Sequence, residues 1–201
     1  KRELPGFSVQ NLMAPLGRKS TVEYLSENIV PKRSAVLILL FPDSTNTFVK
    51  TVLILRPDNE SGNHAGQISF PGGGLDEADK SLSETALRET EEEIGINRNA
   101  TTIIGALTPL YIPVSNYLVH PFVATLKTPP EFIIHLLEVK ELLEVDAEEI
   151  FSDRCKSTSK VYVKIRNATM EVPCYKINGK IIWGATAMII SELSEIIKRM
   201  K

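Results

Sequence analysis

Runs of apolar residues that are typical of β-strands occur throughout the chain. The longest, Ala35–Phe41, is followed after a turn-forming segment by the β-rich stretch Thr47–Arg56, and this spacing predicts a hairpin. An Asn-Gly dipeptide between Cys174–Ile177 and Lys180–Trp183 predicts a second hairpin. Further strands are expected at Gln67–Phe70, Thr101–Leu107, Val119–Leu126 and Lys160–Arg166.

Three other segments have the periodicity or the composition of helices. Ser81–Ile94 is the clearest, because it begins with a capping-box pattern and is followed by Gly95, a typical helix stop. Gly184–Met200 is amphipathic, and Leu136–Phe151 is helical in composition although poorly phased. The sequence therefore predicts helices in all three places.

The order of these elements indicates a fold class. Strands and helices intermix without strict alternation, which predicts an α/β fold with a mixed sheet between helix layers. We expect one such domain over residues 35–201. Residues 1–34 contain three prolines and are expected to form an irregular N-terminal arm with one short helix near Val22–Asn28.

Composition narrows the class of protein. The chain has 201 residues, with 23 basic and 25 acidic side chains and a net charge of −2, which disfavours a nucleic-acid binder. Cys155 and Cys174 lack the number and spacing of a disulfide framework or a metal site, which is typical of a reducing compartment. No apolar run approaches the roughly 20 residues that span a bilayer, and the first residues do not form a signal peptide. We therefore expect a cytoplasmic protein without a membrane partner.

Acidic residues gather on one side of the predicted helix Ser81–Ile94. At about 100° per residue, its apolar positions form one stripe, and three glutamates lie together beside that stripe rather than opposite it. Oxygen ligands of this kind suit Mg²⁺ or Mn²⁺, although glutamate runs are more often simply solvated. The three candidate metal ligands are Glu89, Glu92 and Glu93.

The segment before this helix is rich in glycine. Phe70-Pro71-Gly72-Gly73-Gly74 allows a tight turn with close backbone approach, so a backbone carbonyl such as that of Gly73 is a further candidate ligand. Arg88 is placed either to brace one of the carboxylates or to form an ordinary surface pair.

At these residues the chain resembles the Nudix hydrolases. The second half of their box matches at Arg88–Ile96, whereas Lys80 stands where the box has its first Glu, with Asp79 one position earlier. The segment His64–Gly73, with Arg56 upstream, resembles the coenzyme A pyrophosphatase branch, except that its second Arg is replaced near Gly62 and Asn63. The resemblance implies an α/β/α sandwich and metal-dependent hydrolysis of coenzyme A or its derivatives to 3′,5′-ADP and 4′-phosphopantetheine or its acyl form.

This chemistry gives candidate roles to individual residues. Glu92 or Glu93 is the expected general base, and a glutamate from Glu138–Glu149 is an alternative. Arg56 is a candidate phosphate clamp, while His64 and Gln67 either contact substrate or hold the loop.

Other functions remain open at this point. One is a Nudix pyrophosphatase acting on another nucleoside diphosphate derivative, such as ADP-ribose, which the replaced arginine motivates. Another is a catalytically silent nucleotide-binding module, which has no need of clustered carboxylates. In each case the partner is a small molecule, and a homodimer is the commonest assembly for such a chain.

Overall fold

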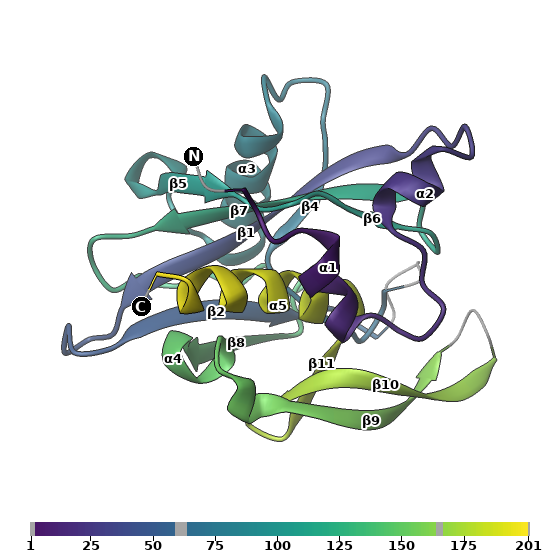
Figure 1. Ribbon diagram of the computed structural model, residues 1–201. Helices are drawn as coiled ribbons and strands as arrows, with labels where there is room; N and C mark the ends of the chain where they lie inside the picture. The colour runs from purple at the N-terminus through teal and green to yellow at the C-terminus, as the bar shows by residue number, and fades with distance from the viewer. Residues whose placement is uncertain (1–2, 59–63, 164–166, 201) are drawn as a thin grey trace.

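The computed structural model describes residues 3–58, 64–163 and 167–200 (Figure 1). In this part of the chain the main feature is an eight-stranded mixed sheet, in which β1 (Lys32–Pro42) is a central strand. β1 runs parallel to β7 (Tyr117–Thr125) on one side and antiparallel to β2 (Val49–Leu55) and β4 (Gly72–Gly74) on the other. The remaining strands are β3 (Ile68–Ser69), β5 (Thr102–Ala106), β6 (Leu110–Ile112) and β8 (Glu141–Asp146).

A second sheet and two long helices complete the fold. The second sheet has the order β11-β10-β9, formed by β9 (Lys156–Val163), β10 (Ala168–Ile177) and β11 (Lys180–Trp183). α3 (Leu82–Ile94) and α5 (Gly184–Lys198) lie on opposite faces of the large sheet (Figure 1). The short elements are α1 (Phe7–Gln10), η1 (Asn11–Met13), α2 (Thr21–Leu25), η2 (Arg98–Ala100), α4 (Ala147–Ile150) and η3 (Asp153–Cys155).

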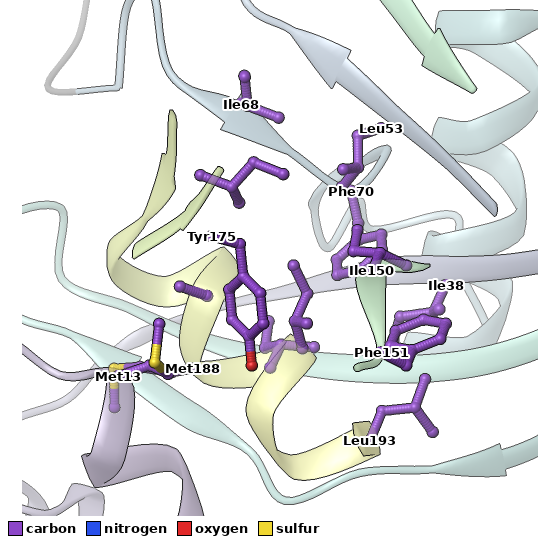
Figure 2. Packing of buried hydrophobic residues seen from close by; sticks show 14 of the residues in the cluster. Met13, Ile38, Leu53, Ile68, Phe70, Ile150, Phe151, Tyr175, Met188 and Leu193 are labelled. Atoms are coloured by element: carbon purple, nitrogen blue, oxygen red, sulfur yellow. The ribbon is translucent and has the colours of Figure 1, made fainter. Parts of the chain in front are cut away.

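β1 divides the interior into two hydrophobic cores. Its side chains alternate between the faces, so that Leu37 and Leu39 pack toward α3 while Ile38 packs toward α5. On the α5 side, Tyr175 of the second sheet is fully buried in the same cluster (Figure 2). The predicted mixed α/β sandwich is therefore confirmed.

Most predicted elements lie where the sequence places them, with shifts of a few residues at their ends. Both predicted hairpins are present, and the residues of the second turn, Asn178 and Gly179, have φ values of 50° and 73°, as a type I′ turn requires. For the predicted strand Lys160–Arg166, residues 164–166 lie outside the described residues, as does the segment with Gly62 and Asn63.

The prediction of a helix over Leu136–Phe151 is wrong. Residues 141–146 form β8, which pairs antiparallel with β2, and only Ala147–Ile150 are helical. Leu143 and Val145 are buried while the residues between and after them are exposed, a period of two that the preceding leucines obscure in the sequence. The free edge of β2 supplies the partner that stabilises this strand.

The N-terminal arm contains more structure than the sequence indicates. Besides α2, which starts one residue before the predicted helix and ends earlier, it forms α1 and η1, and both pack against α5. A fully buried carboxylate, Glu192 of α5, holds this contact. It accepts hydrogen bonds from the Gly6 amide (3.1 Å), the Gln10 side chain (2.8 Å) and the Thr108 hydroxyl (2.6 Å). The arm is thus tied to the last helix and to the segment before β6.

No helix in the described part of the chain is long and apolar enough to cross a membrane.

Candidate active site

Caps at both ends fix the position of α3. The Ser81 side chain accepts a hydrogen bond from the Glu84 amide at 3.2 Å, and Gly95 ends the helix in the left-handed conformation with φ 75°. Ala86, Thr90 and Ile94 are buried against the sheet, as the predicted apolar stripe requires. The face beside this stripe is consequently directed at Phe70–Gly74. We call this segment the glycine turn, although Gly72–Gly74 pair with β1 as the short strand β4 rather than forming the tight turn that the sequence suggests.

The glycine turn fits between β1 and α3 only because it has no side chains. Gly72 has φ 146°, and an added Cβ would overlap the Ala35 carbonyl and lie 2.6 Å from the Cα of Val36. A Cβ on Gly73 would instead lie 2.6 Å from Oε1 of Glu89. The turn therefore contacts the backbone of β1 at one glycine and a carboxylate of α3 at the next.

Two of the three predicted metal ligands lie at this turn. Oε2 of Glu93 accepts a hydrogen bond from the Gly72 amide at 2.8 Å, and Glu93 is only 2% exposed. Glu89 is half-buried and packs on Gly73. Glu92 is directed elsewhere: its side chain is 50% exposed and bonds Arg88.

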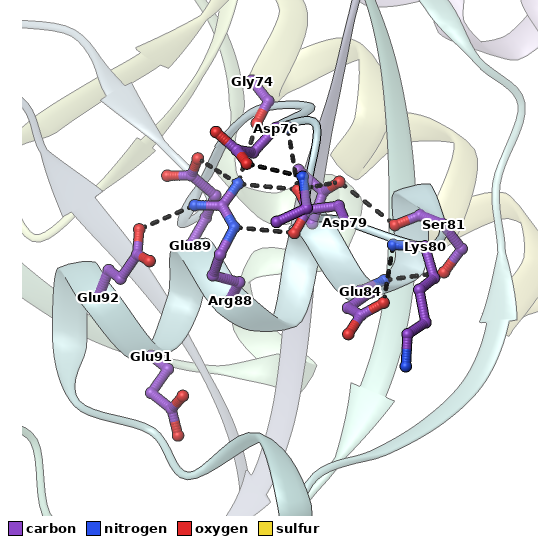
Figure 3. Close-up of polar contacts among 12 residues, drawn as sticks. Gly74, Asp76, Asp79, Lys80, Ser81, Glu84, Arg88, Glu89, Glu91 and Glu92 are labelled. Atoms are coloured by element: carbon purple, nitrogen blue, oxygen red, sulfur yellow. Dashed lines mark hydrogen bonds and ion pairs between the residues drawn. The ribbon is translucent and has the colours of Figure 1, made fainter.

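Arg88 is the centre of a polar network (Figure 3). Its guanidinium donates to both carboxylate oxygens of Asp79 at 2.9 and 3.0 Å, and to the Gly74 carbonyl at 3.1 Å. It also pairs with Glu89 at 3.0 Å and with Glu92 at 2.8 Å. Arg88 therefore braces the carboxylates and joins them to the glycine turn, which is the first of its two predicted roles.

Asp79, rather than Lys80, takes the acidic position in front of α3. The Asp79 side chain is 3% exposed, whereas Lys80 is exposed. The hydrogen bonds from Arg88 hold the pKa of Asp79 well below its usual range, so this carboxylate is ionised at neutral pH. The sequence already contains this signal, because the acid that the box lacks at position 80 stands one residue earlier.

Burial dominates the electrostatics of the glutamates. It raises the pKa of Glu93 to about 8, against the opposing effects of the Gly72 amide and Arg56. Burial also raises the pKa of Glu89, with Arg88 opposing it and Glu92 adding to it. The negative charges on this face are therefore costly without a counter-charge.

A fourth glutamate, Glu138, approaches from the segment that was predicted to be a helix. Repulsion by Glu138 contributes to the raised pKa of both Glu89 and Glu93. The backbone positions this loop, since the His135 amide bonds the Glu93 carbonyl at 2.9 Å and the Glu138 amide bonds the His135 carbonyl at 2.9 Å. Of the candidates in Glu138–Glu149, Glu138 is the one that the structure brings to the site.

The three predicted substrate-binding residues lie on the other side of the turn. Nη1 of Arg56, at the end of β2, is 3.7 Å from Oε1 of Glu93. The His64 ring bonds the Gln67 side chain and the Ser115 hydroxyl, each at 3.0 Å. His64 and Gln67 thus hold the loop in place, and all three predicted residues also line the cavity that opens there.

This cavity has a volume of about 840 Å³. The glycine turn and Arg56 form one part of its wall, and Tyr24 of the N-terminal arm and Tyr117 form another. The β9–β10 ribbon contributes aliphatic side chains, among them Val161 and Met170. Trp183, at the end of β11, is half-buried and also lines the cavity.

The donor set is suited to a hard divalent cation. Glu89, Glu92 and Glu93 offer only oxygen atoms, and the repulsion among them is what such an ion relieves. In the arrangement described, no group of three or more His, Cys, Asp or Glu side chains among the placed residues is close enough to hold a metal. The chemistry thus fits an ion at Glu89 and Glu93, and Glu92 must leave Arg88 before it can join them.

Comparison with known proteins gives a consistent result. Residues 31–159 match the family model described as NUDIX domain. A Photorhabdus laumondii protein named uncharacterized Nudix hydrolase NudL is 38% identical over 147 residues, which cover 72% of this chain and 76% of the relative. A Pectobacterium atrosepticum protein of the same name is 32% identical over 163 residues, 81% of each chain.

Two solved structures share the fold. A Nudix hydrolase from M. smegmatis, RenU, has a TM-score of 0.58 at 14% identity and covers 85% of this chain and 88% of its own. A MutT/nudix family protein from Enterococcus faecalis has a TM-score of 0.53 at 16% identity, covering 98% of this chain and 76% of its own. At these identities the likeness concerns the fold alone.

Proposed function

The chain belongs to the Nudix hydrolase family, and on this premise we propose that it hydrolyses the diphosphate of coenzyme A or its derivatives with the aid of Mg²⁺ or Mn²⁺. The products would be 3′,5′-ADP and 4′-phosphopantetheine or its acyl form. The observation that carries the proposal is the packing of the glycine turn on Glu89 and Glu93 at the wall of the large cavity.

The shape and lining of the cavity support this substrate class. A volume of about 840 Å³ is in the upper part of the range for small-molecule sites. Its wall combines Arg56 and tyrosine rings with the aliphatic side chains of the β9–β10 ribbon. A ligand with a charged nucleotide half and a long, largely apolar half is complementary to such a wall.

The reaction places three demands on the residues of the site. Water adds to one phosphorus, the bridging P–O bond breaks, and the two halves leave as phosphate monoesters. A divalent ion, when bound, would supply neutralisation of the diphosphate charge and acidification of the attacking water. Arg56 would hold a phosphate oxygen pair in its guanidinium fork, and a carboxylate would accept the proton of the water.

Glu92 and Glu93 remain the proposed proton acceptors, with Glu138 as a third candidate. Arg88 would act without touching the proton, because its contacts with Asp79, Glu89 and Glu92 orient the carboxylates. Glu138 is half exposed and outside α3, and its carboxylate lies 3.2 Å from the His135 ring, a contact that it would exchange for one with the substrate.

One assay tests the proposal. The protein is incubated with Mg²⁺ or Mn²⁺ and with coenzyme A, acyl-coenzyme A, ADP-ribose and diadenosine compounds, and the products are identified by mass. Turnover of coenzyme A or its acyl form is expected. Turnover of ADP-ribose alone would instead support the other Nudix activity, and turnover of no compound would support a silent binding module.

A pair of variants tests the role of the acidic face. Glu92→Gln is expected to lower turnover at least about 10²-fold, the lower range for a positioned acid–base group. Glu91→Gln is the matched control, since Glu91 is on the same helix but bonds Arg98 away from the glycine turn. Near-normal turnover in Glu92→Gln would refute a role for Glu92 in metal binding or proton transfer.

A further inference from the structure

The N-terminal arm covers the free edge of β6. The Thr21 hydroxyl accepts a hydrogen bond from the Tyr111 amide at 3.0 Å, and Nη2 of Arg18 donates to the Tyr111 carbonyl. Both backbone groups of Tyr111 on this edge are therefore satisfied by the arm, and Figure 1 shows α2 beside β6.

Arg18 has more binding capacity than this contact uses. Its Nε is shielded from solvent and has no hydrogen-bond partner among the described residues, and no carboxylate in that part of the chain pairs with it. Burial lowers the pKa of Arg18, and the electrostatic effect of Tyr24 offsets this shift only in part. A guanidinium that is withdrawn from water without an opposite charge is costly, and the wall of a cavity is where a ligand can supply that charge.

Arg18 is distant from the glutamates across the sheet. Tyr111 pairs with Leu118, Leu118 pairs with Arg33, and the Arg33 carbonyl accepts the amide of Leu75, which follows the glycine turn. Three strand spacings separate the ends of this row by roughly 14 Å. Because this row joins the strand edge that Arg18 contacts to the residue after the glycine turn, a group bound at Arg18 would be distinct from a diphosphate held near Glu89 and Glu93.

The surroundings of Arg18 indicate which half of a substrate it meets. Tyr24 lines the cavity with it, and the Tyr24 ring lies 5.3 Å from the ring of Tyr111. Aromatic faces suit a nucleobase, whereas the aliphatic side chains of the β9–β10 ribbon suit the other half of the substrate. The nucleotide half of a bound substrate would therefore lie beside Tyr24 and Arg18.

We propose that Arg18 binds a phosphate group that the substrate carries on its ribose, outside the scissile diphosphate. The inference rests on the proposed function and names the feature of the substrate that the enzyme selects. The planar fork of a guanidinium matches a phosphate in two parallel hydrogen bonds, and the bond to Tyr111 uses only one of the N–H groups on the two terminal nitrogens of Arg18. The N-terminal arm would thereby supply an arginine to the cavity, while the sequence has none at Gly62 or Asn63.

Binding measurements test this role without requiring turnover. Adenosine 3′,5′-bisphosphate and adenosine 5′-monophosphate are titrated calorimetrically into the wild-type protein, which is expected to bind the bisphosphate at least about tenfold more tightly. Arg18→Gln should weaken bisphosphate binding by about 10- to 100-fold, the range for a charge-assisted hydrogen bond, and change monophosphate binding less than about twofold. Lys19→Gln is the control, because it removes the same charge from the adjacent, exposed residue.

A purely structural role for Arg18 predicts different results. If the contact with Tyr111 were all that mattered, Arg18→Gln would weaken both ligands equally, which would overturn the inference. Equal affinities of the two ligands in the wild-type protein would overturn it as well, whatever the stability of the variant. Arg18→Lys retains the charge and a donor for Tyr111 but not the fork, and is expected to keep only part of the selectivity.

The two proposals fail separately. Selective binding of the bisphosphate without hydrolysis of any diphosphate substrate would refute the proposed function and support the role of Arg18. Hydrolysis of coenzyme A and of its analogue without the 3′-phosphate with equal kcat/KM, unchanged in Arg18→Gln, would support the reaction and refute the role of Arg18.

Discussion

The same added methyl group should impair stability at Gly72 and turnover at Gly73. In Gly72→Ala the Cβ would meet the backbone of β1, and the residue would keep a φ of 146° that an L-residue rarely adopts. In Gly73→Ala the atoms nearest to the Cβ would be those of the Glu89 carboxyl group. The first obstacle cannot move without separating two strands, whereas the second is the end of a side chain.

The magnitudes follow from this difference. A strained φ costs about 1–3 kcal/mol and an overpacked contact about 1–3 kcal/mol, so Gly72→Ala should destabilise the fold by about 2–6 kcal/mol. For a domain of this size, the corresponding fall in Tm is on the order of 5–20 °C. Gly73→Ala should cost less than about 1 kcal/mol in stability, but displaces Glu89 and should lower turnover at least about tenfold.

Thermal denaturation followed by circular dichroism, together with the hydrolysis assay, separates the two effects. Gly105→Ala is the control, since nothing lies within 4 Å of a Cβ at that position of β5. Two results would refute the reasoning: a Tm of Gly72→Ala within about 2 °C of the wild type, or a loss of stability in Gly73→Ala as large as that in Gly72→Ala.

Three further variants follow from contacts described above. Asp79→Asn should lower turnover at least about tenfold, because the guanidinium of Arg88 loses its charged partner, whereas Lys80→Gln should leave turnover unchanged. Equal activities of the two variants would refute the assignment of Asp79 to the acidic position. Glu192→Gln should destabilise the protein by about 2–4 kcal/mol in chemical denaturation because buried donors lose their charged acceptor, whereas the surface variant Glu195→Gln should change stability by less than about 0.5 kcal/mol. Hydrogen bonds from two lysines lower the pKa of Asp153 to about 2, so its contribution is present above the unfolded-state pKa of about 3.9 and disappears as the pH falls toward 2. Because 58% of this side chain is exposed, Asp153→Asn should cost less than about 1 kcal/mol at pH 7 and nothing near pH 2, and a cost that persists in acid would contradict the mechanism.

Local signals in the sequence were sufficient for the elements that carry the site. The helix Leu82–Ile94 was predictable because its caps and its apolar period lie within one stretch of chain. The same period predicts that Glu89 and Glu93 lie beside the core. In the structure both contact the glycine turn at this position. The prediction that all three glutamates form one cluster stays a prediction, since Glu92 bonds Arg88 in the arrangement described.

Features that depend on distant partners were not predictable in the same way. β8 has the composition of a helix and becomes a strand because β2 offers it a free edge. Glu138 reaches the site because its loop bonds the end of α3, and Arg18 reaches the cavity because β6 needs an edge partner. In each case a tertiary contact determines where the residue or strand lies, and no local pattern in the sequence predicts that contact.

The buried carboxylate of Glu192 also sets an order of events while the protein is being synthesised. Translation proceeds from the N-terminus, so Gly6 and Gln10 leave the ribosome long before the helix that holds their acceptor. Until then the first turn of the arm lacks its acceptor, whereas Arg18 and Thr21 can already bond the edge of β6. α1 is therefore made before the helix that holds it, and it takes its final position only after α5 has formed.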